Sequence, residues 1–297
     1  MRKKTQHRLE YGIVLALGFF LRLFPYSVSL FFADIIGSLF YLFGRKRRKI
    51  ALENLLRCFP DKDENELKRI AKGAYRKIAS SFMEYILFPK LDKEKTMSLV
   101  EFEGLEFFDS VLKEGKGAVL VTGHFGSWEL MGAAISQKGY PIDFLVGEQH
   151  NLLVDNLMNK HRRMMGIGII KMGAAAKGVI KALKENRFVA RLSDQDAGKD
   201  GTVVDFLGFP ASTPKGPAAF SLKTGAPMIM GFIIRGNGKK QKIILERVEP
   251  IQKTSDKEEN IKRLTQAYTS LLERYVRKYP DHWYWLHRRW KSTLAPQ

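Results

Sequence analysis

A histidine and a glutamate at close spacing could form an acid–base site in this chain. His124 stands in GAVLVTGHFGSWEL, residues 117–130, and Glu129 follows it with four residues between them. Histidine is the usual general base near neutral pH. A carboxylate in the first turn of a helix stays ionised, so it could orient the imidazole and stabilise its protonated form. The same spacing also fits a capping histidine beside a solvated glutamate, because the pattern often occurs by chance.

The sequence offers no protein nucleophile next to this histidine. It contains no G-x-S-x-G motif of the kind that presents a hydrolase serine, and its single cysteine, Cys58, lies in a separate polar segment with helical character. No H-E-x-x-H motif or histidine cluster predicts a zinc site. We therefore expect the nucleophile to come from a substrate, with neither a metal nor a cofactor.

A group of three aspartates, Asp194, Asp196 and Asp200, superficially resembles a calcium-binding loop. The sixth position of such a loop is Lys199, where glycine is required, and the twelfth is Asp205, where a bidentate glutamate is expected. The spacing therefore argues against a calcium site.

The segments around His124 predict the fold that must position it. From about Phe102, short apolar runs alternate with segments of helical periodicity, which is typical of β-α-β units around a largely parallel sheet. An apolar strand ends at Val121 and a helix begins near Ser127. His124 would thus lie at the carboxyl end of a strand, where open α/β sheets bind ligands. The predicted fold class is α/β, with a central, mostly parallel sheet flanked by helices.

Other strands extend this predicted sheet. They are expected at residues 142–146, 167–172 and 188–193. Residues 228–250 hold two apolar strands around Asn237 and Gly238, a strong hairpin signal. We expect this hairpin to finish one edge of the sheet.

Helices are predicted on either side of this α/β region. Residues 49–88 have a helical apolar stripe that ends before Pro89, and they should join the amino-terminal segment to the sheet. A last helix is predicted from about Asp256 to Lys278. The expected organisation is an amino-terminal anchor at residues 1–48, a helical lead-in at 49–100 and an α/β core at 101–297.

The amino-terminal segment predicts a membrane anchor. Residues 11–43 are almost wholly apolar and lie between two basic clusters. Arg22 and Asp34 make a clean transmembrane span unfavourable, because a charge at mid-bilayer costs about 3 kcal/mol on insertion scales. We expect two helices that meet near Pro25 as an in-plane or re-entrant anchor, with both basic flanks on the cytoplasmic side. A single pass and a buried helical hairpin of a soluble protein are the alternatives.

The overall composition narrows the class of partner. The chain has 297 residues, 45% of them hydrophobic, and a formal net charge of +19. Such a charge attracts nucleic acid, acidic carrier proteins or anionic lipid. No recognised nucleic-acid motif is present, and the basic residues flank the apolar run, so membrane lipid is the expected partner and nucleic acid is not. The single cysteine is consistent with a reducing compartment.

Several ordered motifs, taken together, resemble the lipid A biosynthesis lauroyl/myristoyl acyltransferases, the late acyltransferases of the lysophospholipid acyltransferase-like superfamily. The resemblance extends over essentially the whole chain. The motifs are His124-Phe125-Gly126-Ser127-Trp128-Glu129, then Asn151, Asp155 and Arg162, then Ser193-Asp194-Gln195-Asp196, the run from Val204 to Met228, and Trp285-Leu286-His287-Arg288-Arg289.

This resemblance implies a glycerolipid acyltransferase-like fold and an acyl-transfer reaction. His124, with Glu129 as its partner, would deprotonate an acceptor hydroxyl, which attacks an acyl thioester on acyl carrier protein. Arg162 or Arg163 is the implied stabiliser of the resulting oxyanion. Both arginines also fit an ordinary basic helix face that contacts lipid headgroups.

The implied acceptor is a glycolipid, a lipid A precursor of the Kdo2-lipid IVA type, at the cytoplasmic face of a bacterial inner membrane. Other glycolipid or lysophospholipid acceptors, and acyl-CoA as donor, remain open alternatives. The alternatives without enzymatic activity are a membrane scaffold and a basic nucleic-acid-binding protein.

A set of polar positions is predicted to bind substrate. They are Asn151, Asp155, Asp194, Gln195, Asp196, Thr213, Lys215, Gly216, Arg288 and Arg289. The resemblance implies that the run from Asp194 to Asp196 lines the pocket at a strand end, where it could hold a sugar hydroxyl or support the base. The run also fits a plain loop, since Asp and Gly are ordinary turn residues. Gly216 and Lys215 suit a phosphate-binding helix start or simple helix punctuation. The aromatic and basic tail at residues 282–291 suits a membrane interface, and would equally suit single-stranded nucleic acid.

Overall fold

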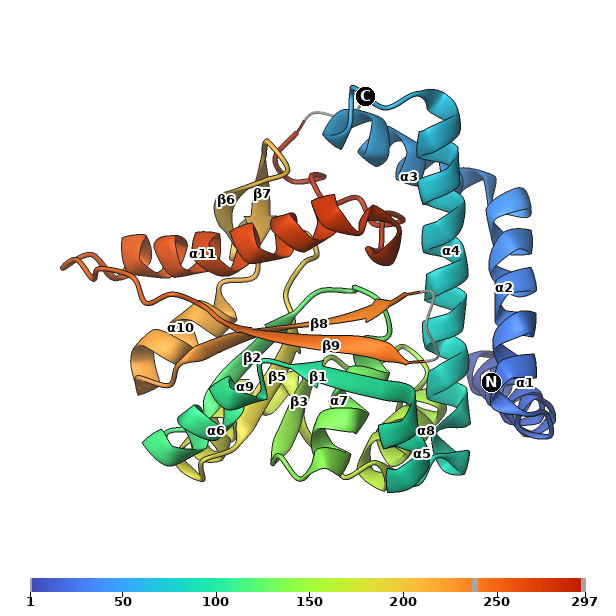
Figure 1. The fold of residues 1–297 in the computed structure, drawn as a ribbon, viewed down its shortest axis with the longest axis horizontal. Helices are drawn as coiled ribbons and strands as arrows, with labels where there is room; N and C mark the ends of the chain where they lie inside the picture. The colour runs from blue at the N-terminus through green and yellow to red at the C-terminus, as the bar shows by residue number, and fades with distance from the viewer. Residues whose placement is uncertain (1, 237–239, 295–297) are drawn as a thin grey trace.

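The computed structural model describes residues 2–236 and 240–294, and a seven-stranded sheet lies at the centre of this part of the chain (Figure 1). The strand order is β1-β9-β8-β2-β5-β3-β4. The bounds are β1 (Val100–Glu103), β2 (Ala118–Thr122), β3 (Ile142–Val146), β4 (Gly168–Lys171), β5 (Phe188–Leu192), β8 (Met228–Arg235) and β9 (Gln241–Arg247). The block from β8 to β4 is parallel throughout, so the predicted α/β class is confirmed.

The predicted hairpin is present, but it does not finish the sheet. β8 and β9 pair antiparallel, from Ile229 opposite Arg247 to Arg235 opposite Gln241. Its predicted turn residues, Asn237 and Gly238, lie outside the described residues. The edge position was wrong, because β1 pairs with the outer side of β9. This four-residue edge strand is too short and too polar for its periodicity to be read from the sequence.

A second, two-stranded sheet was also missed. β6 (Thr202–Phe206) and β7 (Phe209–Thr213) form an antiparallel hairpin. Leu207 and Gly208 make its turn with φ values of 54° and 86°, as two-residue hairpins require. The Leu207 amide donates to Glu273 at 2.7 Å, which holds the turn against the last helix.

Helices cover both faces of the main sheet. They are α1 (Arg2–Arg22), α2 (Tyr26–Phe43), α3 (Arg45–Cys58), α4 (Glu64–Leu87), α5 (Lys93–Leu99), α6 (Leu105–Glu114), α7 (Trp128–Lys138), α8 (Leu152–Met164), α9 (Ala175–Lys184), α10 (Gly216–Thr224) and α11 (Lys257–Lys278). Short 3-10 turns occupy Phe88–Lys90, Met172–Ala174, Gly198–Asp200 and Pro280–His282. One apolar core packs under α9, α10 and α11, and another under α5, α6 and α7.

The helical lead-in is divided, whereas the sequence predicted continuous helix over residues 49–88. A break that contains Pro60 separates α3 from α4. The Asp63 side chain then accepts from the Glu66 amide at 2.9 Å and begins α4 as a helix cap. The predicted last helix agrees with α11, which is capped by Asp256.

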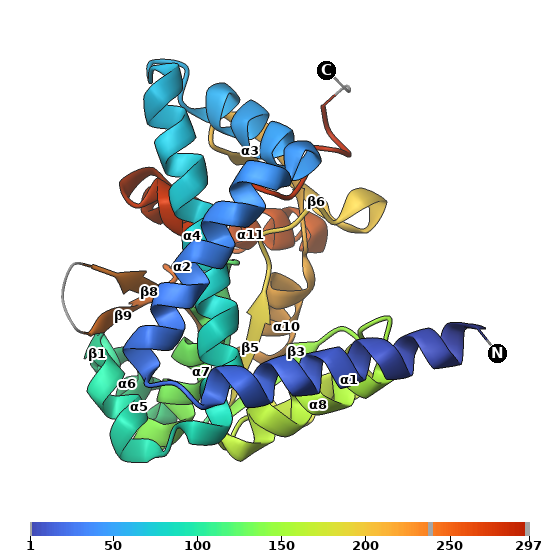
Figure 2. The same cartoon turned by 90° about the vertical axis from the view of Figure 1, so that its right-hand side faces the viewer.

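The two amino-terminal helices meet at Pro25, as predicted. α2 runs along α4, and α1 turns away to lie along α8 (Figure 2). At the α2–α4 contact, a Cβ atom on Gly37 would lie 2.7 Å from the Arg76 Cα atom, so only glycine permits this approach. Asp34 is accommodated by an ion pair with Arg76.

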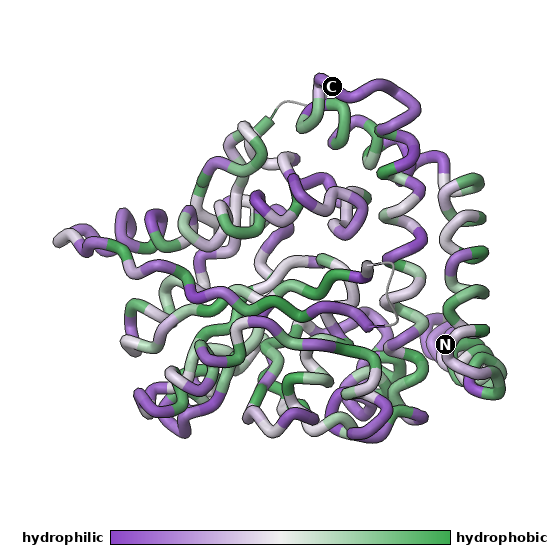
Figure 3. The backbone as a smooth tube through the Cα atoms, in the orientation of Figure 1, coloured by the Kyte–Doolittle hydropathy of each residue, from purple (hydrophilic) through white to green (hydrophobic). Residues whose placement is uncertain are grey.

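The opposite side of these helices is apolar and exposed. Phe31, Phe40 and Phe43 are 64%, 63% and 73% exposed, and the outer side of α2 is coloured largely apolar in Figure 3. Among the described helices, α2 is the one that is long and apolar enough to cross a membrane. Such a face is unusual in a soluble monomer and fits contact with lipid.

The carboxyl-terminal tail is part of the core, which corrects the expected membrane-interface role. Trp283, Trp285 and Trp290 are at most 2% exposed. Asn54 on α3 donates to the Trp285 carbonyl at 2.9 Å. The tryptophans therefore pack in the interior, against Phe59 at the end of α3 and against Phe206 and Phe209 of the β6–β7 hairpin, instead of facing lipid or nucleic acid.

Candidate active site

Two adjacent strands bring the candidate base together with a carboxylate. His124 follows β2 and Asp194 follows β5, and these strands are parallel, with Thr122 opposite Leu192. The Ser193 amide continues the pairing by donating to the Thr122 carbonyl at 2.9 Å. Because both strands end at the same level, the two following side chains emerge side by side, as expected at the carboxyl edge of an open sheet.

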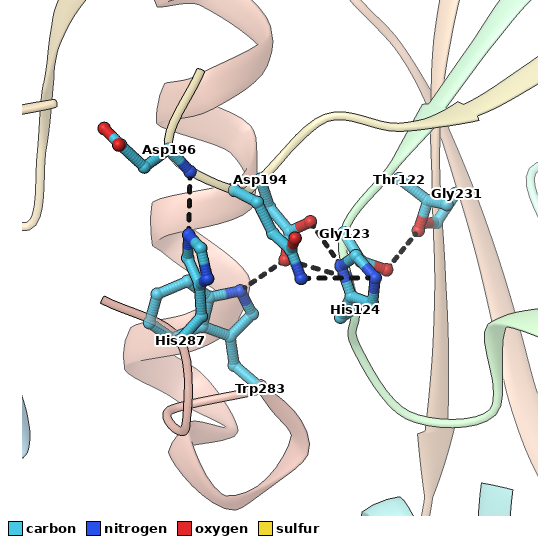
Figure 4. Close-up of polar contacts among 9 residues, drawn as sticks. Thr122, Gly123, His124, Asp194, Asp196, Gly231, Trp283 and His287 are labelled. Carbon is cyan, nitrogen blue, oxygen red and sulfur yellow. Dashed lines mark hydrogen bonds and ion pairs between the residues drawn. The ribbon is translucent and has the colours of Figure 1, made fainter. Parts of the chain in front are cut away.

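Asp194 holds His124 in a fixed orientation (Figure 4). Its Oδ1 atom lies 2.8 Å from His124 Nδ1. Its Oδ2 atom accepts from the His124 amide at 2.8 Å and from Trp283 Nε1 at 2.9 Å. Burial alone would raise the pKa of Asp194, but the imidazole and these donors hold it below its usual range. Asp194 is therefore an anion aimed at one imidazole nitrogen.

This arrangement selects the tautomer of His124. An ionised carboxylate accepts a hydrogen bond from Nδ1–H, so the proton of the neutral imidazole stays on Nδ1 and Nε2 carries the lone pair. The His124 side chain is 22% exposed, and Gln195 Nε2 lies 3.5 Å from His124 Nε2. The basic nitrogen thus faces the accessible side of the site.

Glu129 is bonded elsewhere, which corrects its predicted role as the partner of His124. Its carboxylate accepts hydrogen bonds from Arg162 Nη2 at 2.5 Å and from Arg162 Nε at 3.1 Å. Burial acts to lower the pKa of Arg162, but Glu129 outweighs it and the pKa is raised. Glu129 lies in the first turn of α7, as predicted, and its side-chain bonds are to Arg162 on α8, whereas the carboxylate bonded to the imidazole is that of Asp194.

The two candidate arginines differ in their surroundings. Arg162 is 9% exposed and also donates to Asn159 Oδ1 at 3.0 Å. The neighbouring Arg163 side chain is exposed on the other side of α8. Arg162 is therefore the arginine that reaches the interior of the site.

The loop that carries His124 is held from several directions. Gly126 has a φ of 58°, and its amide donates to the His282 carbonyl at 2.8 Å. The Tyr284 amide donates to the His124 carbonyl at 3.1 Å. The carboxyl-terminal tail therefore runs along this loop and fixes its backbone, a contact that no local motif predicts.

A buried carboxylate supports the loop from below. Glu84 on α4 has no exposed surface and accepts from Ser127, the residue that begins α7. It also accepts from Tyr26 on α2, from Arg235 on β8, and from Gln241 on β9 at 2.7 Å. The sequence gives no signal for Glu84, because its donors come from four separate segments.

An apolar cavity lies next to the His124 loop, with Thr122 and Trp128 in its lining. It has a volume of about 360 Å³ and lies on the α7 side of the sheet. Its wall includes Trp128, whose ring meets the His124 ring edge-on at a centroid distance of 5.1 Å. Leu120, Met131 and Phe144 are among its apolar walls, and Glu129 and Arg162 add a charged side. The cavity suits a ligand with a long apolar portion.

A polar cavity of about 430 Å³ adjoins it. His124, Gln195 and Asp196 line it, together with Lys215 and Gly216 at the start of α10. Arg191 and Leu192, at the end of β5, line both cavities. The candidate base thus lines the polar cavity and contacts Trp128, which lines the apolar one.

Other predicted site residues have structural contacts. Asn151 caps α8 by accepting from the Leu153 amide at 3.1 Å, and its amide nitrogen donates to Glu10 on α1 at 2.8 Å. Asp155 is 2% exposed and accepts from Asn159 at 3.0 Å. These contacts fix α8 against α1, away from the imidazole.

The remaining predicted positions are divided between core and surface. Thr213 and Arg289 are buried and bonded to each other, so the structure does not support direct substrate contact by either. Arg288 is exposed. Within residues 2–236 and 240–294, no group of His, Cys, Asp or Glu side chains is arranged to hold a metal ion.

Comparison with known proteins gives a consistent family. The profile of the bacterial lipid A biosynthesis acyltransferases matches residues 1–292. A lipid A biosynthesis lauroyltransferase of Escherichia coli is 27% identical over 90% of this chain and 87% of its own. The E. coli lipid A biosynthesis palmitoleoyltransferase is 24% identical over 90% and 86%.

A relative that is named for a different acceptor is also similar to this chain. The phosphatidylinositol mannoside acyltransferase of Mycolicibacterium smegmatis is 23% identical over 78% of this chain and 75% of its own. All three relatives are acyltransferases by name, and the family profile spans both cavities and the His124 loop. The chain therefore belongs to the bacterial lipid A biosynthesis acyltransferase family and is an acyltransferase.

Proposed function

We propose that this enzyme transfers a fatty acyl chain from acyl carrier protein to a hydroxyl of a lipid A precursor, with His124 as the general base. The observation that carries this proposal is the pairing of His124 Nδ1 with the Asp194 carboxylate at 2.8 Å, which leaves Nε2 as the basic nitrogen of a histidine that lines the polar cavity. In this proposal Asp194, and not Glu129, orients the base, because the Asp194 carboxylate is the one bonded to His124 Nδ1.

The reaction needs only the two substrates and this pair. His124 Nε2 takes the proton of the acceptor hydroxyl as the oxygen forms a bond to the thioester carbonyl carbon. The tetrahedral oxyanion then collapses, the carbon–sulfur bond breaks, and the departing thiolate receives the proton from Nε2. Asp194 stabilises the imidazolium between these steps. The products are an ester and a free thiol, and the base is regenerated.

Each substrate is assigned to a cavity by its chemistry. The acyl chain occupies the apolar cavity, and the hydroxyl-bearing head of the acceptor occupies the polar one. Arg162 lines the apolar cavity and is proposed to stabilise the oxyanion, whereas Arg163 is exposed. Gln195 and Asp196, on the polar side, are proposed to hold acceptor hydroxyls. The net charge of +19 favours an acidic carrier protein as donor.

The anchor is proposed to hold the enzyme on the cytoplasmic face of the bacterial inner membrane. Residues 1–48 would form this anchor, with the exposed apolar side of α1 and α2 in lipid and residues 49–297 as the catalytic part. The basic run at 45–49 would then lie against anionic headgroups. Membrane lipid thus both holds the enzyme and supplies its acceptor.

A second acceptor class is favoured by one observation. Relatives named phosphatidylinositol mannoside acyltransferases are 23% and 26% identical to this chain, comparable to the lipid A enzymes. The shared feature of both acceptor classes is a sugar hydroxyl on an anchored lipid. A phosphatidylinositol mannoside is therefore the alternative acceptor within the same reaction.

Mass spectrometry of lipids tests the proposal. Purified enzyme in lipid nanodiscs is incubated with acyl carrier protein thioesters, or acyl-CoA, and separate acceptors: a lipid A precursor, a phosphatidylinositol mannoside and a lysophospholipid. We expect one added acyl mass on the lipid A precursor, lost in His124→Ala. Transfer only to another acceptor would correct the substrate, and undiminished transfer by His124→Ala would refute the mechanism.

A further inference from the structure

Arg191 is a cation inside the site that none of the contacts described above explains. It stands on β5, two residues after Val189, which is buried in the core under α9, α10 and α11. Side chains alternate along a strand, so Arg191 projects to this same side. Ala190 projects to the other side and lines the apolar cavity, whereas Arg191 and Leu192, at the end of the strand, line both cavities. Arg191 therefore extends into the polar cavity beside the start of α10.

The guanidinium has no counter-ion in the protein. Within residues 2–236 and 240–294, no hydrogen bond or ion pair involves it. Burial lowers the pKa of Arg191, and Tyr268 opposes this only in part. Other buried arginines have partners, since Arg162 pairs with Glu129, Arg235 pairs with Glu84, and Arg289 donates to Ser212 and Thr213. A partly buried cation without a partner is unfavourable for the free protein.

The chain leaves room for this side chain at one particular place. A Cβ atom on Gly216 would lie 2.9 Å from Arg191 Nη1, so a larger residue there would press on the guanidinium. Lys215 lines the same cavity, with its ammonium 3.3 Å from Glu258 at the exposed rim. Two cationic side chains, Arg191 and Lys215, thus line the same polar cavity.

We propose that Arg191, assisted by Lys215, binds a phosphate group of a substrate in the polar cavity while the hydroxyl of that substrate lies at His124. The proposal rests on the proposed function for the identity of the reaction. A phosphate supplies the missing negative charge, and two of its oxygens match the fork of a guanidinium. A neutral sugar hydroxyl would leave the charge uncompensated. A cavity of about 430 Å³ can hold such a group beside a sugar ring.

Stability separates this role from a structural one. A structural arginine loses its partners when it is replaced, so the protein becomes less stable. Arg191 has no partner to lose, so Arg191→Met should unfold at the same temperature as the wild type or above it. A marked fall in the melting temperature would contradict the proposal.

Kinetics then identify the ligand and its source. We compare wild type, Arg191→Gln and Arg191→Lys in nanodiscs, using an acceptor with and without its phosphate. Arg191→Gln should raise KM for the phosphorylated acceptor by about tenfold to a hundredfold, the range for a lost charge-assisted contact. It should leave KM for the dephosphorylated acceptor unchanged, and Arg191→Lys should recover part of the loss. Lys223→Gln, an exposed lysine on α10, is the matched control.

The donor provides the other possible source of phosphate. An acyl pantetheine thioester without phosphate replaces the acyl carrier protein thioester in a second series. If the penalty of Arg191→Gln disappears in that series and persists with both acceptors, the phosphate belongs to the donor. Inorganic phosphate should inhibit the wild type in competition with the phosphorylated substrate and inhibit Arg191→Gln at least about tenfold more weakly.

The outcomes distinguish the two proposals. If wild type transfers acyl chains through His124 but the penalty of Arg191→Gln is the same with every phosphate-free substrate, the phosphate subsite is wrong and the function stands. If wild type transfers nothing to any acceptor, the proposed function fails. Inhibition or binding by inorganic phosphate that is equal in wild type and Arg191→Gln also refutes the subsite.

Discussion

Asp194 Oδ1 and His124 Nδ1 lie 2.8 Å apart, although 69 residues lie between these two positions in the chain. Their meeting depends on β2 and β5 being neighbours in the sheet. The pair is thus a product of topology, and it determines which imidazole nitrogen is basic.

Replacing the carboxylate should reveal this dependence. Asp194→Asn removes the charge that stabilises the imidazolium and can stabilise the wrong tautomer, so we expect kcat to fall on the order of a hundredfold to ten-thousandfold. Single-turnover transfer from acyl carrier protein, with membrane association followed in parallel, is the measurement. An Asp205→Asn variant, at an exposed position on β6, is the control. Activity within a few-fold of wild type would remove Asp194 from the mechanism.

The ionisation of Asp194 also predicts how stability changes with pH. Its pKa is lower in the folded state than in the unfolded chain, where it is about 4. The carboxylate therefore adds stability above about pH 4, and this contribution is lost as pH falls through the lower, folded value. Melting temperatures between pH 7 and pH 3 should fall more steeply for wild type than for Asp194→Asn. Parallel curves for the two proteins would show that this ionisation does not contribute.

Glu129 and Arg162 should behave as a buried pair. Glu129→Gln leaves the Arg162 charge uncompensated at 11% side-chain exposure, so we expect unfolding to become easier by about 3–5 kcal/mol. Glu129→Gln with Arg162→Met should recover much of this loss, because no charge is left buried. Denaturant titration in detergent measures both. The pH profile of kcat/KM should keep the same apparent pKa in Glu129→Gln. A shifted profile would show that Glu129, and not only Asp194, acts on His124.

The length of the transferred chain should depend on the α7 wall. A Cβ atom on Gly132 would overlap the Phe144 ring, and both residues line the apolar cavity. Gly132→Ala should therefore push the ring into the cavity and shift preference toward shorter acyl chains. Competition among carrier-protein thioesters of different length reports the shift. Gly12→Ala, where nothing lies within 4 Å, is the helical control; an equal shift there would disconnect chain length from this cavity.

Local periodicity was enough to predict the α/β class and much of the sheet. β2, β3, β4 and β5 are apolar runs between helical segments, so their type follows from short-range pattern. The same information placed His124 correctly at a strand end. β1 and the β6–β7 hairpin were missed, because short strands with mixed polarity carry little periodic signal.

The partners of the site residues needed the tertiary structure. Glu129 was the carboxylate nearest to His124 in sequence, but its place on α7 directs it to Arg162 on α8. The resemblance placed Asp194 in the pocket, either to hold a sugar hydroxyl or to support the base, and only the tertiary structure shows its bond to the imidazole. The sequence did not single out Arg191, because neither the absence of a partner for its guanidinium nor its closeness to Gly216 can be predicted from sequence alone.

The Glu84 carboxylate joins the lipid-facing part of the molecule to its reactive loop, because Tyr26 of α2 and Ser127 beside the His124 loop bind the same group. Deleting the first 48 residues to obtain a water-soluble enzyme would therefore remove one of the ligands of a carboxylate that has no access to water. It would also uncover the side of α4 that Gly37 approaches. The amino-terminal helices, which are proposed to attach the enzyme to the bilayer, also complete its interior contacts, so preparations intended for inhibitor screening or crystallisation need residues 1–48.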